Sequence, residues 1–336
     1  MKRTRGVLLF CLLVVSVVAT GETPPTLRFS LPPVMEALPV AFAAEWGLFE
    51  AHGVNVELVG ITDNQERSGA LLTGNLDGLM SDVTHAILDA STGLGLVMTA
   101  AARSHPQTGS VALALLSPAS FRITTFEELL LSNQLTGILY RSDYEYMLAE
   151  LVETTAKGEG ETASCTSFTD MLQLATMLGA QFLASAVLPE PYVSYISTYT
   201  PANGEPLELV LLSDFEGLVL PPTVVLFRKS FAEEFPEAVT AFHAAYAEAI
   251  ARLNEISRDE LVETGLEVAV SLFFQAANVE LIGQDVLDAI PIPVFEPLGI
   301  LEFDEYEGIA EWMLSKAYVF GEIPAHEELV DWQFLP

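Results

Sequence analysis

Nine short apolar runs alternate with segments of helical periodicity along this chain, and this alternation limits the folds that it can adopt. Each run has the length and the apolar composition of a buried β-strand. The runs cover residues 27–31, 54–59, 76–80, 96–101, 111–116, 136–140, 184–188, 207–212 and 223–227. Helical periodicity over residues 38–51, 64–73 and 84–90 ends near a glycine in each case. Alternating strands and helices predict a mainly parallel, doubly wound α/β architecture.

The first residues have the pattern of a secretory signal peptide. Three basic residues among the first five precede an uncharged apolar run over residues 6–18, and small residues follow it. The run is too short to span a bilayer comfortably, so a retained N-terminal anchor is the weaker interpretation. We therefore expect residues 1–21 to be a signal peptide, cleaved after Ala19 or Gly21, and the protein to be periplasmic.

The two cysteines limit the chemistry available to the exported chain. Cys11 lies inside the predicted signal, which leaves Cys165 alone and allows no internal disulfide. A lipoprotein signal needs a cysteine directly after the cleavage site, preceded by a small residue. Cys11 follows Phe10, and Glu22 directly follows Gly21, so the chain is not expected to be a lipoprotein. Cys165 has no neighbouring histidine or arginine in sequence to lower its pKa, which favours a structural thiol.

The charge of the chain excludes one large class of partners. Its 14 basic residues face 46 acidic ones, for a net charge of −32, and three of the basic residues belong to the predicted signal. The exported chain therefore keeps 11 basic residues and a net charge of −35. Nucleic acid is not an expected partner, because phosphate binding needs clustered lysine and arginine. Hydrophobic residues make up 51% of the chain, which indicates a folded protein of about two domains.

Several segments resemble the binding proteins for aliphatic sulfonates, taurine, nitrate and thiamine pyrimidine precursors, which serve ABC importers. They include the stretch AAEWGLFEAHGVNVEL at 43–58, GNLD at 74–77 and AVLPEPY at 186–192. The others are PPT at 221–223, the long helical segment 231–254 and the C-terminal part 290–335. In order and spacing these segments cover nearly the whole exported chain.

This resemblance implies a periplasmic binding protein of type II, with two doubly wound α/β lobes joined by two crossing hinge strands. Residues 26–112 plus 226–336 would form the first lobe and residues 113–225 the second. The strands over 111–116 and 223–227 would cross between the lobes. The implied function is capture of a small-molecule solute between the lobes and its delivery to an ABC permease in the inner membrane, by a monomer without a cofactor.

Candidate ligand contacts follow from the rule that ligands of α/β sheets bind outside the carboxyl ends of the strands. The candidates are Pro32, Pro33, Met35, Glu36, Thr62, Asp63, Ser81, Asp82, Thr84, Arg103, Ser104, Arg141, Ser142, Asp143, Tyr144, Glu190 and Tyr192. Helix capping is an alternative role for Ser81, Asp82, Thr84 and Asp143, and backbone amides at the same helix start would suit an anionic oxygen.

The arginines and tyrosines among these candidates leave the chemistry of the solute open. Arg103 and Arg141 could hold a sulfonate, carboxylate or phosphate in a bidentate fork, or could be neutralised by the nearby Asp82 and Asp143. Tyr140, Tyr144 and Tyr192 could stack on a flat heterocycle or belong to the core.

The sequence contains no motif that indicates an enzyme. It has no Gly-x-Ser-x-Gly elbow, no His-Glu-x-x-His, no paired-cysteine metal spacing and no Gly-Lys-Ser/Thr phosphate loop, and its five histidines are scattered. We therefore expect neither an enzyme nor a metal site. Two alternatives stay open: a ligand-sensing module for a membrane receptor, and an enzyme of the same fold. The fungal pyrimidine synthases need a cysteine-rich motif that Cys165 alone does not supply, and the related menaquinone-route enzymes are cytoplasmic.

Overall fold

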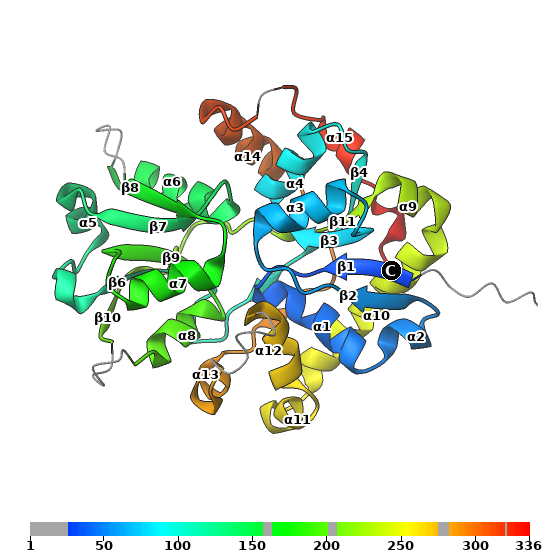
Figure 1. The fold of residues 1–336 in the computed structure, drawn as a ribbon, viewed down its shortest axis with the longest axis horizontal. Helices are drawn as coiled ribbons and strands as arrows, with labels where there is room; N and C mark the ends of the chain where they lie inside the picture. The colour runs from blue at the N-terminus through cyan, green and yellow to red at the C-terminus, as the bar shows by residue number, and fades with distance from the viewer. Residues whose placement is uncertain (1–25, 157–162, 201–206, 275–281, 320) are drawn as a thin grey trace, which may run out of the picture.

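The computed structural model describes residues 26–156, 163–200, 207–274, 282–319 and 321–336. The predicted signal peptide lies outside the described residues. Two five-stranded sheets, each covered by helices, form two separate bodies (Figure 1). We call the first sheet with its helices the first lobe, and the second sheet with its helices the second lobe.

The first sheet has the strand order β2-β1-β3-β11-β4. Its strands are β1 (Thr26–Ser30), β2 (Asn55–Leu58), β3 (Gly78–Ser81), β4 (Leu96–Ala102) and β11 (Thr223–Arg228). β1 runs parallel to β2 and β3, whereas β11 runs antiparallel to β3 and β4, between which it lies. The whole of β4 is buried, as is expected for a strand covered by helices on both faces.

The second sheet repeats this arrangement with the order β10-β6-β9-β7-β8. Its strands are β6 (Leu113–Pro118), β7 (Leu135–Leu139), β8 (Ser164–Phe168), β9 (Ser185–Pro189) and β10 (Leu209–Ser213). β7 runs parallel to β8 and β9, and β6 runs antiparallel to β9 and β10. A two-stranded sheet of β5 (Ser104–His105) and β12 (Val294–Phe295) lies outside both.

Helices connect the strands and cover both sheets (Figure 1). They are α1 (Leu38–Glu45), α2 (Leu48–Ala51), α3 (Asn64–Leu72), α4 (Val83–Ser91), α5 (Phe126–Ser132), α6 (Asp143–Ala156), α7 (Met171–Gly179), α8 (Tyr192–Thr198), α9 (Lys229–Glu234), α10 (Pro236–Glu255), α11 (Arg258–Glu263), α12 (Leu266–Phe274), α13 (Gln284–Ala289), α14 (Phe303–Ser315) and α15 (His326–Leu329). The predicted helix 38–51 is divided at Gly47, whose φ of 66° no α-helix accommodates. The predicted helix 231–254 is divided before Pro236, which opens α10 at its first position.

The predicted α/β fold of two lobes is confirmed, but the crossing segments differ from the prediction. The predicted crossing strand 111–116 corresponds to β6, which pairs entirely within the second sheet. The predicted return strand corresponds to β11, which pairs along its whole length within the first sheet. The chain crosses in residues 106–112 and 214–222, which are not strands. Apolar content predicted the strands correctly, but it does not show in which sheet a strand pairs.

An aromatic cluster between the sheet and helix α10 stabilises the first lobe. Phe29, Phe227 and Phe242 are fully buried, and their ring centroids lie 4.6–5.6 Å apart. Gly78 of β3 packs closely against Phe227 and leaves no room for a larger side chain at its position. Phe29 and Phe227 come from strands far apart in sequence, so this cluster fixes β11 in the first sheet.

Candidate functional site

Three adjoining hollows lie between the lobes, and each is lined from both sides. The central hollow encloses about 480 Å³ and is lined by Glu36, Asp82, Ala112, Leu113, Asp143, Tyr144, Met147, Pro189, Leu220, Pro221, Pro222 and Thr223. The proline hollow encloses about 330 Å³ and is lined by Met35, Glu36, Ser104, Pro106, Ser110, Val111, Ala112, Pro189, Glu190, Pro291 and Pro293. The arginine hollow, also about 330 Å³, is lined by Pro32, Pro33, Val34, Asn64, Arg67, Asp82, Leu139, Tyr144, Met171 and Thr223.

Shared side chains join the hollows into one cleft. Glu36 and Pro189 line both the proline and the central hollow, and Asp82 and Tyr144 line both the central and the arginine hollow. Asp82 directly follows β3, and Tyr144 lies in the first turn of α6, beyond the end of β7. The strand-end rule therefore places these residues where the structure has them.

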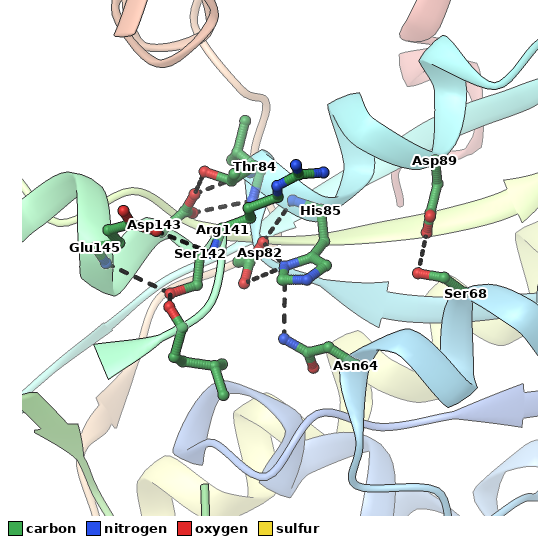
Figure 2. Close-up of polar contacts among 12 residues, drawn as sticks. Asn64, Ser68, Asp82, Thr84, His85, Asp89, Arg141, Ser142, Asp143 and Glu145 are labelled. Atoms are coloured by element: carbon green, nitrogen blue, oxygen red, sulfur yellow. Dashed lines mark hydrogen bonds and ion pairs between the residues drawn. The ribbon is translucent and has the colours of Figure 1, made fainter. Parts of the chain in front are cut away.

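Asp143 reaches from the second lobe to the start of helix α4 in the first (Figure 2). Its carboxylate accepts hydrogen bonds from the backbone N–H groups of Val83 and Thr84, both at 2.9 Å, and from the Thr84 hydroxyl at 2.6 Å. It thereby satisfies amides that a helix start leaves without a partner. Asp143 is 5% exposed, and burial together with the charge of Asp82 raises its pKa to about 7.

Asp82 and His85 form a second polar group beside this contact. Asp82 caps α4 by accepting from the His85 backbone N–H at 2.7 Å, and its carboxylate lies 3.0 Å from His85 Nδ1 (Figure 2). Burial lowers the pKa of His85, but the charge and the hydrogen bond of Asp82 outweigh it, so the pKa is raised. The pair therefore favours an imidazolium beside a carboxylate.

Arg67 is the one basic side chain that lines the cleft in the described part of the chain. Its Nη1 donates to the Met80 carbonyl at 3.0 Å and its Nη2 to the Asn64 side chain at 2.9 Å. The residue is 3% exposed, and burial lowers its pKa to about 10 against the opposing charges of Asp82 and Asp89. Arg67 was not among the predicted site residues.

A signal for Arg67 was present in the sequence. Asn64, Arg67 and Leu71 are the buried residues of α3, and their spacing of three and four places them on one helical face. An arginine on the same face as a buried leucine indicates a cation turned toward the interior. The strand-end rule does not find it, because Arg67 lies inside a helix.

Glu190 lines the proline hollow and is 6% exposed. Its two oxygens accept from the backbone N–H and the hydroxyl of Ser194, both at 3.1 Å. Burial raises the pKa of Glu190 to about 7, and the hydrogen bonds from Ser194 only partly oppose it. The ionised form is thus less stable in the folded protein than in the unfolded chain.

Replacing Glu190 with glutamine is therefore expected to stabilise the protein at pH 8 by about 1–2 kcal/mol. The raised pKa means that the stability from Glu190 is fully present below about pH 4 and is lost as the pH rises toward 7. Glutamine keeps an acceptor for the Ser194 N–H, and the Ser194 hydroxyl can still donate to the Ala289 carbonyl at 3.2 Å. Urea unfolding at pH 8 and at pH 4.5 measures the difference.

Glu128 provides a control, because its pKa is shifted in the opposite direction to that of Glu190. It is exposed, and hydrogen bonds from the backbone and side chain of Thr124 lower its pKa. Glu128→Gln should therefore bring no gain at pH 8. An equal effect of Glu190→Gln at both pH values would show that the pKa of Glu190 is not raised.

Arg103 and Arg141 line none of the three hollows. Nη2 of Arg103 donates to both carboxylate oxygens of Glu305, at 2.5 and 2.7 Å, and Nη1 donates to the Leu220 carbonyl. The guanidinium carbon of Arg141 lies 4.8 Å from the ring centre of Tyr140 and 5.0 Å from that of Tyr318. Both arginines thus have partners within the protein, although neither is paired with the aspartate that the sequence suggested.

The other predicted residues divide into those that line the cleft and those that support it. Pro32, Pro33, Met35, Glu36 and Ser104 line it, and Ser104 donates to Glu36 at 2.8 Å.

The remaining predicted residues lie behind the lining. Thr62 donates to Asp170 across the lobes at 2.9 Å, and Asp63 caps α3. Ser81 and Ser142 are buried, with Ser142 donating to the Leu139 carbonyl. Tyr192 is fully buried and donates to the Phe273 carbonyl at 2.7 Å.

Cys165 lies on strand β8, away from the cleft lining, and is an exposed residue. Removal of its thiol from water, together with the charge of Glu145, raises the pKa of Cys165 to about 11. The thiol is therefore protonated at neutral pH, which lowers its reactivity.

Solved structures share this arrangement, although sequence comparison finds no relative. No model of a known protein family matches the chain, and no curated protein matches it. The alkanesulfonate-binding protein SsuA from Xanthomonas axonopodis pv. citri, bound to MOPS, superposes with a TM-score of 0.69 at 14% identity, over 93% of this chain and 100% of that one. The aliphatic sulphonate-binding SsuA from Escherichia coli gives 0.68 at 16% identity, over 93% and 99%.

A third similar structure binds a different anion. The periplasmic nitrate-binding protein NrtA from Synechocystis PCC 6803 superposes with a TM-score of 0.62 at 12% identity, over 93% of this chain and 87% of that one. Identities of this size establish likeness of fold and leave ligands undetermined. Together with the two sheets and the cleft between them, these superpositions show that the protein has the fold of the periplasmic binding proteins.

Proposed function

We propose that the protein is an extracytoplasmic solute-binding protein that holds a small molecule between its two lobes and delivers it to an ABC permease. The central hollow is the observation that carries this proposal, because Glu36, Asp82 and Thr223 line it from the first lobe and Asp143 and Tyr144 from the second. A solute in this hollow touches both lobes at once. It therefore stabilises the closed arrangement over an open one by the contacts that only closure provides.

The segments that join the lobes support this mechanism. In the described part of the chain the crossings between the lobes lie in residues 106–112 and 214–222, and neither forms a strand of either main sheet. Elsewhere the lobes touch through apolar contacts, such as Tyr192 with Phe274, and through polar contacts, such as Thr62 with Asp170, and the polar contacts can exchange for water when the lobes separate. Such contacts are suited to a reversible closure.

The predicted location and partner follow from the same proposal. No helix in the described ranges is both long and apolar enough to cross a membrane. Export by the signal peptide would place the protein beside a permease in the inner membrane. The alternative of a sensor module makes the same use of the cleft, and genes for a permease and an ATPase beside this one would favour import.

A thermal-shift screen of the purified protein against sulfonates, nitrate, pyrimidines and other small metabolites tests the proposal. A bound solute at hundredfold excess over its dissociation constant adds about 2.7 kcal/mol to the stability and raises the melting temperature. Small-angle scattering of the same samples should show the closed form gaining population. Turnover of any of these compounds by the pure protein would contradict the proposal.

A further inference from the structure

Tyr144 lies between groups of opposite charge, where the central and arginine hollows meet. Burial raises the pKa of its phenol well above the usual value, and the charges of Glu36, Asp82 and Asp143 raise it further, whereas Arg67 lowers it. Glu36, Asp82 and Asp143 line the central hollow together with Tyr144, and Arg67 lines the arginine hollow together with it. Among the described residues the Tyr144 hydroxyl has no hydrogen-bond partner, so it is free to bond a guest in either hollow.

On one side of Tyr144, Arg67 has more hydrogen-bonding capacity than its neighbours use. Its hydrogen bonds to Met80 and Asn64 engage Nη1 and Nη2, and its buried Nε has no partner in the described part of the protein. The ion pairs found among the described residues do not include Arg67. A guanidinium that is 97% buried and lines a hollow without a paired carboxylate calls for an acceptor group from elsewhere.

The central hollow, by contrast, is lined by carboxyl groups and would suit a hydrogen-bond donor or a cation. Glu36, Asp82 and Asp143 line it, and its lining contains no lysine or arginine. The Glu36 carboxylate accepts from the Ser104 hydroxyl and from its own backbone N–H, but burial outweighs both and raises its pKa. Buried carboxylates need a positive partner or N–H donors. Within the described ranges no three acidic, histidine or cysteine side chains are grouped to hold a metal ion.

The start of helix α4 is the remaining polar group of the cleft, and it offers a simple anion few free donors. The amides at the start of α4 would suit an anionic oxygen, but the Asp143 carboxylate already accepts from Val83 and Thr84. An anion placed there would have to displace Asp143 and lie beside Asp82. The polar groups that are left favour a guest with both an acceptor end and a donor end.

We propose that the solute is a small amphoteric molecule, with an acceptor such as a carboxylate toward Arg67 and an ammonium or similar cationic group toward Glu36 and Asp143. Its middle lies across Tyr144. This assignment rests on the proposed solute-binding function and names the charge class of the guest. It also makes Arg67, Tyr144 and Glu36 the residues that determine specificity.

The test uses three series of compounds matched in length: unbranched ω-amino carboxylic acids with three to six carbons, the corresponding alkyl carboxylates and the corresponding alkylamines. Each is titrated into the purified protein at pH 7 with the melting temperature as the readout. We expect one or more amino acids to bind at least tenfold more tightly than the carboxylate and the amine of the same length. At hundredfold excess over its dissociation constant, such a guest should raise the melting temperature by about 5 °C or more.

Matched variants show whether each end of the guest meets the assigned residues. Arg67→Gln should weaken the amino acid tenfold or more and leave any amine affinity unchanged. Glu36→Gln should weaken amino acid and amine alike without affecting a carboxylate. Because Arg67 is buried and its substitution can disturb folding, Glu36→Gln and Tyr144→Phe provide independent readings of the binding.

The outcomes separate this inference from the proposed function. Tighter binding of an alkyl carboxylate, nitrate or a sulfonate than of every amino acid would overturn the amphoteric guest while solute binding stood. An alkylamine as tight as its amino acid would overturn it too, since Arg67 would then contribute nothing. If no compound of these series or of the wider metabolite panel bound, the solute-binding function itself would fail.

Discussion

Replacing Asp143 with alanine is expected to shift the protein toward an open form at pH 8. The substitution removes the acceptor for two backbone N–H groups of α4 and for the Thr84 hydroxyl, all of them buried in the closed form. Leaving these donors without partners costs the closed form about 2–4 kcal/mol. Opening lets water satisfy them. We therefore expect a larger radius of gyration by small-angle scattering and faster hydrogen exchange at Val83 and Thr84.

Asp63→Ala is the matched control, because Asp63 caps α3 by accepting from the Glu66 N–H within a single lobe. Loss of that cap should cost about 1 kcal/mol and leave the radius of gyration unchanged. Asp143→Asn keeps one acceptor oxygen and removes a charge that burial and Asp82 disfavour, so it should open the lobes less than alanine does. An unchanged radius and unchanged exchange at α4 in Asp143→Ala would show that this contact does not hold the lobes together.

Substituting alanine for Gly78 is expected to destabilise the first lobe by about 3 kcal/mol. A Cβ at this position would lie 2.6 Å from Cδ1 of Phe227 and 2.7 Å from the carbonyl oxygen of Leu226. Phe227 is held in the aromatic cluster, and the Leu226 carbonyl belongs to the backbone of β11, so neither can move easily. Strands β3 and β11 must separate locally, and urea unfolding measures the loss.

Gly60→Ala serves as the comparison. A Cβ there would meet nothing within 4 Å, and its backbone is outside the left-handed region, so the stability should change by less than about 0.5 kcal/mol. Equal stability of the Gly78 and Gly60 variants would mean that the contact between β3 and β11 is looser than described.

The strands were predictable because burial on both faces leaves a continuous apolar run in the sequence. All nine predicted runs correspond to strands, within three residues at either end. Three described strands were missed: the two-residue strands β5 and β12, and β8, which reads Ser-Cys-Thr-Ser-Phe and lies at the edge of the second sheet. An edge strand with alternating exposure buries too little apolar surface to appear as an apolar run.

The cleft was only partly predictable, for two physical reasons. The strand-end rule identified residues such as Glu36, Asp82 and Tyr144, since it depends only on where a strand ends. It did not identify Arg67, which lies within a helix, or the contact of Asp143 with α4. That contact is made between lobes, and the sequence of one lobe does not show how the other closes on it.

The placement of β11 imposes an order on biosynthesis. This strand lies inside the first sheet, but it is synthesised only after strands β6 to β10 of the second sheet. The second lobe, whose strands come from one continuous stretch, can therefore condense while the first still has β3 and β4 unpaired along the edges that β11 will join. During that interval β3 and β4 expose backbone N–H and C=O groups that can pair with other chains, so chaperone protection is most needed before residue 223 is synthesised.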